Sequence, residues 1–117
     1  MKQKALLIFC LVILSIAGFA QKATVAGLTG GDVTKEQLLA ATKLDVDTMY
    51  RVYSFLMTYL TKQELTDFRC MGPGFTPEMR EVIKNAESGA KLIFEEIIVT
   101  DEKGVRYKAA PISFKIK

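Results

Sequence analysis

Three pairs of acidic residues are the best candidates in this sequence for metal binding or acid–base catalysis. They are Asp45 with Asp47, Glu95 with Glu96, and Asp101 with Glu102. A calcium loop needs more oxygen ligands at fixed spacing and a turn glycine, which the first pair lacks. A glycosidase needs two carboxylates across a cleft, and a domain of this size offers little cleft. We therefore interpret these acids as solvated surface groups.

The sequence contains no histidine and no tryptophan. Without histidine, histidine-based triads, the usual proton shuttle near neutral pH and most transition-metal sites are excluded. Cys70 is the sole cysteine after residue 20, and no histidine can activate it. We interpret Cys70 as a small buried residue, with an intermolecular disulfide as the alternative. The sequence thus predicts a protein that is not an enzyme, with no catalytic residue, cofactor or metal.

Aromatic side chains gather at residues 50–59. Tyr50, Tyr53, Phe55 and Tyr59 could form an exposed recognition stripe or fill the core. Most aromatic residues in such a pattern are buried, so we expect core positions for most of them. A tyrosine left exposed would make a good interface anchor.

The N-terminal segment has the pattern of a secretory signal peptide. Lys2 and Lys4 precede an apolar run at residues 5–20, which ends with Gly18 and Ala20 at the −3 and −1 positions. This pattern predicts a signal peptide at residues 1–20, cleaved between Ala20 and Gln21. The run is shorter than the roughly 20 residues of a membrane-spanning helix. An uncleaved anchor is the alternative.

The charge balance of the remaining chain argues against nucleic acid as a partner. The full sequence has 16 basic and 13 acidic residues, and removing two lysines with the leader leaves 14 against 13, a net charge of +1. Nucleic-acid binding depends on clustered positive charge, which this balance does not supply. We expect residues 21–117 to form one domain, held by packing because one cysteine cannot form an internal disulfide.

Three segments ahead of the C-terminus carry local structural signals. Thr34 and Gln37 fit a capping box and predict one or two helical turns. Residues 48–61 fit either a helix or a strand, and their tyrosines and valine favour the strand. A third segment predicts a helix at about residues 77–88, because Thr76 suits the cap and Pro77 the first helical position. Its apolar residues follow helical spacing, so it should pack on a sheet.

The last 29 residues, from Gly89 to Lys117, predict three strands. Gly104 suits a hairpin turn, and the apolar alternation changes phase at Glu95–Glu96, which indicates a β-bulge. In the final strand, Ser113, Lys115 and Lys117 alternate with inward isoleucine and phenylalanine. We expect this strand to be a sheet edge at which a partner strand adds, with its lysines limiting uncontrolled pairing. The predicted fold is mainly β: an antiparallel, β-sandwich-like sheet with one short α-helix.

Five motifs in this order resemble a known family. They are GGDVTKEQLLAA (30–41), VYSFLM (52–57), FTPEMREVIKNAESGAKLIFEEI (75–97), GVRY (104–107) and ISFKIK (112–117). Together they are similar to the C-terminal domain of the gliding-motility protein GldM and its type IX secretion counterpart PorM, over nearly all of residues 21–117. The resemblance also favours a strand at residues 48–61.

The resemblance implies a periplasmic, mostly β, non-catalytic domain that binds proteins associated with the outer membrane. The end of the leader, FAQ (19–21), is similar to that of exported proteins of the Bacteroidota. GldM-like proteins carry a membrane-spanning helix and further domains ahead of this one. We therefore expect a stand-alone exported module that serves the gliding and secretion machinery. Its expected partners are envelope proteins, with a homodimer left open, and its location is periplasmic or secreted. Residues 61–74 are shorter than the family's connecting region, so partner identity does not transfer. The alternative is a small secreted β-domain inhibitor or ligand-binding protein unrelated to gliding.

Overall fold

A computed structural model describes residues 22–117, and the mainly β fold is confirmed. The predicted signal peptide and its cleavage point at Ala20 and Gln21 lie outside the described residues. The strands are β1 Gly31–Val33, β2 Arg51–Leu60, β3 Leu65–Met71, β4 Lys91–Thr100, β5 Arg106–Ala109 and β6 Ile112–Ile116. The helices are α2 Lys35–Leu39 and α3 Pro77–Lys84. The strand favoured for residues 48–61 is therefore confirmed as β2.

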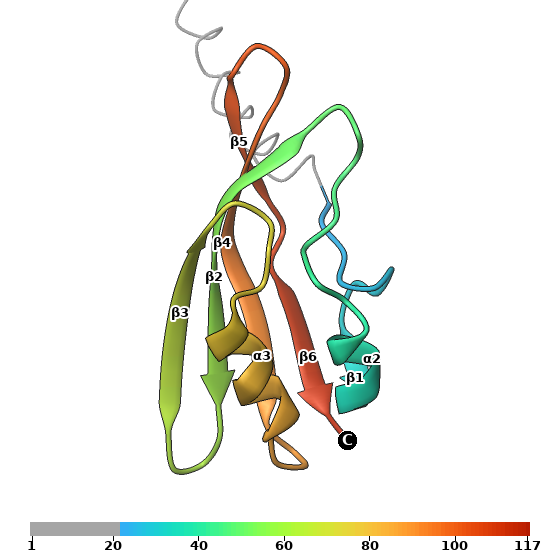
Figure 1. The fold of residues 1–117 in the computed structure, drawn as a ribbon, viewed down its shortest axis with the longest axis vertical. Helices are drawn as coiled ribbons and strands as arrows, with labels where there is room; N and C mark the ends of the chain where they lie inside the picture. Colours follow the sequence, from blue (N-terminus) through green and yellow to red (C-terminus); the bar gives the residue numbers. More distant parts are fainter. Residues whose placement is uncertain (1–21) are drawn as a thin grey trace, which may run out of the picture.

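The strands form one sheet with the order β1-β6-β4-β2-β3, and both helices lie over the same face of it (Figure 1). β5 pairs with the upper half of β4, while β6 pairs with its lower half. All pairings are antiparallel except that of β1 with β6, which is parallel. The layer that covers the sheet consists of helices and loops, rather than the second sheet of a sandwich.

Local signals begin α3 where the sequence predicts it. The Thr76 hydroxyl accepts a hydrogen bond from the Met79 amide at 3.2 Å, and Pro77 occupies the first turn. The helix ends at Lys84, earlier than the expected residue 88, because Asn85 takes a non-helical cap conformation. Met79 and Ile83 are completely buried, so the apolar face of α3 packs against the sheet.

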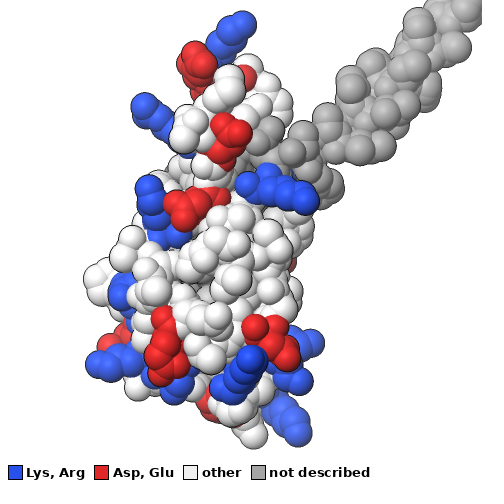
Figure 2. Space-filling view, turned by 90° about the vertical axis from the view of Figure 1, so that its right-hand side faces the viewer, with Lys and Arg blue, Asp and Glu red and all other residues white. Residues whose placement is uncertain are grey.

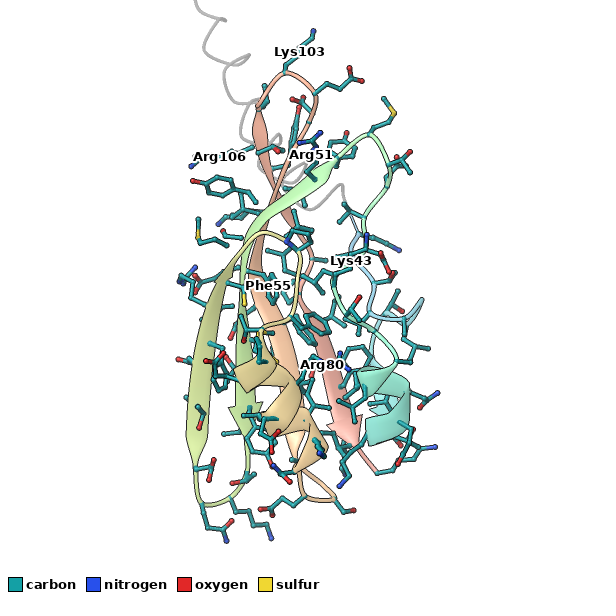
Figure 3. All side chains as sticks on the ribbon, in the orientation of Figure 1. Lys43, Arg51, Phe55, Arg80, Lys103 and Arg106 are labelled. Atoms are coloured by element: carbon teal, nitrogen blue, oxygen red, sulfur yellow. The ribbon has the colours of Figure 1, made fainter. Side chains whose placement is uncertain are left out.

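A second helix, α2, lies beside α3, so the expectation of one helix packed on the sheet was incomplete. Thr34 and Gln37 form the predicted capping box. The Arg80 guanidinium reaches from α3 and donates to the carbonyls of Ala41 at 2.8 Å and Leu39 at 3.1 Å. Figure 3 shows Arg80 in this place between the two helices. These bonds satisfy carbonyls at the end of α2 that the helix itself leaves unpaired.

Four phenylalanines form the centre of the core. Phe94 on β4 stacks on Phe75 with the ring centroids 5.5 Å apart, and contacts Phe55 at 6.0 Å and Phe114 at 6.2 Å. Phe55, Phe94 and Phe114 are almost completely buried. The aromatic cluster therefore joins β2, β4 and β6 to the loop that leads into α3.

The predicted bulge at Glu95–Glu96 is confirmed. Between the pairs Leu56–Glu95 and Ser54–Ile98, β4 has one residue more than β2, and Glu96 has a φ of 50°. An extra residue flips the alternation of a strand, so apolar side chains can stay on the core face on both sides of the bulge. The bulge lies between the half of β4 that pairs with β6 and the half that pairs with β5.

Candidate functional site

β6 is not an edge of the sheet, so that part of the prediction for Ser113, Lys115 and Lys117 was wrong. β4 pairs with one side of β6 and β1 with the other, where Asp32 lies opposite Lys115. The Lys117 amide also donates to the Val33 carbonyl at 2.9 Å. A Cβ on Gly30 would lie 3.0 Å from the Ser113 carbonyl oxygen, so the chain approaches β6 closely. The outward side chains of β6 stay exposed, but much of its backbone is already paired.

β3 ends the sheet on the side opposite β1, and its outer edge is a free edge that the sequence reasoning missed. Among residues 22–117 it pairs with β2 alone, from Ser54–Met71 to Leu60–Leu65. Thr66, Phe68 and Cys70 point toward the core face, while Leu65, Asp67, Arg69 and Met71 are exposed. This alternation of exposed and inward residues, within residues 61–74, was a sequence signal that could have predicted the strand. An unpaired strand edge offers backbone donors and acceptors to another chain.

Exposed apolar side chains lie at both ends of this edge. Leu65 is 62% exposed and Met71 is 67% exposed. Near Met71, the side chain of Tyr53 stays outside the core because Tyr53 is an extra residue in β2 relative to β4. The Arg106 guanidinium lies 4.2 Å from the centre of the Tyr53 ring, a cation–π contact. Figure 3 labels Arg106 on this side of the molecule.

Residues 50–59 therefore divide between core and surface. Phe55 and Tyr59 are buried, Tyr50 is half-buried against Tyr107, and Tyr53 is exposed. The expectation that most of these aromatics fill the core is met. Tyr53 is the exposed aromatic of the four.

The bulge brings Glu95 and Glu96 to the helix-free face. The Thr58 hydroxyl lies 3.2 Å from Glu95 Oε2 and 2.9 Å from Asp67 Oδ1. Arg69 forms an ion pair with Glu96 at 2.6 Å, although both side chains are more than half exposed. These carboxylates link β2, β3 and β4 across the surface, which gives them a structural role.

Asp101 organises the β4–β5 hairpin. Its Oδ1 accepts hydrogen bonds from the amides of Lys103 and Val105, both at 2.9 Å, and the Tyr107 hydroxyl donates to its Oδ2 at 3.1 Å. The Val105 amide contributes most to lowering the pKa of Asp101 below its ordinary value. The bond to the carboxylate in turn raises the pKa of Tyr107. This acid therefore shapes a turn.

Cys70 is buried, as predicted. Its sulfur lies 3.0 Å from the Met79 sulfur, beneath α3. Burial raises the pKa of its thiol, which disfavours the reactive thiolate.

Neither a metal cluster nor a membrane-spanning helix occurs in the described part of the chain. No three metal-binding side chains come together within residues 22–117. No helix there has the length and apolar character needed to cross a bilayer.

Comparison with known proteins agrees with the resemblance. No curated protein matches this chain. The family model of the GldM C-terminal domain matches residues 17–117, which include every described strand and helix. The chain therefore belongs to the GldM C-terminal domain family.

Proposed function

We propose that this chain is an exported, non-enzymatic protein-binding module of the cell envelope that serves the gliding-motility and type IX secretion machinery. The family match over residues 17–117 carries the proposal, because GldM is a component of that machinery. The leader pattern at residues 1–20 supports export, with cleavage before Gln21 and a mature domain at residues 21–117 in the periplasm or outside the cell.

Two features of the described domain support protein binding over catalysis. The acids singled out at residues 95, 96 and 101 have structural hydrogen bonds or ion pairs. Within residues 22–117 the outer edge of β3 is unpaired, and this strand carries exposed Leu65 and Met71 at its two ends. Strand addition to such an edge supplies affinity through backbone hydrogen bonds.

Photo-cross-linking in the bacterium that carries this protein tests the proposal. A photoreactive phenylalanine is placed at Met71 beside the β3 edge, at Ser113 on β6, or at exposed Glu36 on α2 as a control. We expect Met71 to capture gliding or secretion proteins and Glu36 to capture none.

The other outcomes are equally informative. Capture of the same proteins from Ser113 instead would move the binding surface to β6. Capture of unrelated extracellular proteins alone would refute the role in gliding and support the inhibitor or ligand-binding alternative.

A further inference from the structure

A groove runs between β3 and α3, directly beside the free edge. Its volume is about 540 Å³. Tyr59, Phe68 and Val82 supply its apolar lining, and Phe68 and Val82 are half-buried. Since Phe68 belongs to β3, a strand that pairs with β3 would bring every second side chain to this groove.

The charged residues that line this groove are all negative. Four glutamates line it and no basic residue does: Glu64, Glu78, Glu81 and Glu87. Three other surface hollows carry both signs, for example Arg69 with Glu96 and Lys43 with Asp45. Figure 2, which shows the side of the molecule away from β3, likewise has lysines and arginines among the acids. Of these four hollows, the β3–α3 groove is the one lined by charges of a single sign.

Local structure accounts for part of this cluster. Glu78 lies in the first turn of α3, where a negative charge is favourable, and the Asn85 amide donates to Glu81 at 2.9 Å. Glu64 comes from the β2–β3 turn and Glu87 from beyond the end of α3. The ion pairs among the described residues involve Asp45 and Glu96, so neither neutralises the groove.

We propose that β3 and this groove bind an extended, basic segment of a partner protein. The segment adds as a strand to β3 and turns Lys or Arg side chains toward the glutamates, with an apolar residue on Phe68 between them. The free edge supplies backbone hydrogen bonds, and the groove supplies selectivity through charge. This inference rests on the proposed function and adds the chemistry of the partner.

A random 12-residue peptide library displayed on phage tests the inference on the protein purified from its complete coding sequence. The most enriched peptide is then synthesised and its affinity measured by fluorescence anisotropy. The test variant carries Glu64→Gln, Glu78→Gln and Glu87→Gln. The control variant carries Asp32→Asn, Glu36→Gln and Glu102→Gln, the same charge change at exposed positions elsewhere.

We expect enriched peptides with Lys or Arg at alternate positions around an apolar residue. Affinity should fall about tenfold in the test variant, since it loses three screened surface pairs of modest strength, and should change little in the control. Amide hydrogen exchange in residues 65–71 should slow when the peptide is bound.

Several results would overturn the inference. These are enrichment of acidic or neutral peptides, no enrichment, equal loss in both variants, or unchanged exchange in β3. The photo-cross-linking experiment separates the two proposals. If the photoreactive residue at Met71 captures gliding or secretion proteins equally well with and without the three Glu→Gln changes, the proposed function stands and the basic partner segment is refuted.

Discussion

Truncation of Phe94 should remove a large part of the stability of this domain. Its ring is completely buried and contacts three other phenylalanine rings at 5.5 to 6.2 Å. Phe→Ala in a core costs about 3–5 kcal/mol through lost burial and the cavity left behind. Each aromatic pair adds about 0.5–1.5 kcal/mol beyond burial. We therefore expect Phe94→Ala to lower the free energy of unfolding by about 5 kcal/mol, out of a typical total of about 5–15 kcal/mol.

Equilibrium unfolding in urea measures this loss. With an m value of about 2 kcal/mol per molar urea, the midpoint should fall by about 2–3 M with m unchanged. Tyr53→Ala is the matched control, since Tyr53 is an aromatic residue of β2 that is 39% exposed under Arg106. Its loss should be about 1 kcal/mol or less. Equal losses in the two variants would refute the aromatic cluster as the centre of the core.

Three further predictions follow from contacts outside the core cluster. Arg80→Lys should cost about 1–3 kcal/mol in the same urea assay, because an ammonium cannot reproduce both guanidinium bonds to the end of α2, and an unchanged midpoint would contradict this. The pKa of Asp101 is lowered in the folded state, so its stabilising contribution is present above the unfolded value of about 3.9 and is lost as pH falls through the folded value. NMR titration of Tyr107→Phe should show the pKa of Asp101 higher than in the parent yet still below its ordinary value, since the turn amides remain; no change would exclude the tyrosine bond. Cys70 should react slowly with a thiol reagent at pH 8 in the native protein and quickly in urea, and equal rates would contradict its burial.

Several elements were predictable because neighbouring residues determine them. Thr76 and Pro77 start α3 through a cap and a preset φ, whatever the rest of the chain does. Gly104 takes the positive φ of the β4–β5 turn, and the phase change at Glu95–Glu96 marks the bulge. At β2 the tyrosines and valine favoured a strand and the family resemblance added to this, but the side chains satisfy both periodicities. Pairing with β3 and β4 decides between a helix and a strand there.

The candidate site was harder to predict because it depends on the order of the strands. The final strand has outward polar residues at Ser113 and Lys115, which suit an edge and a covered strand equally well. β1, more than 70 residues earlier in the chain, covers it, while β3 is left free. The acidic groove likewise has lining residues from the β2–β3 turn and from α3. The sequence of either segment alone does not predict that the two lie close together.

The sequence by itself thus determined the mainly β class, the helix starts, the hairpin, the bulge and the family, since these depend on short-range hydrogen bonds, alternation or ordered motifs. Tertiary structure alone decided which strands lie at the edges of the sheet and which charges share a surface. The physical reason is that backbone hydrogen bonds between strands are alike for every side chain. Strand order is therefore selected by packing between segments distant in sequence, such as Phe55, Phe94 and Phe114.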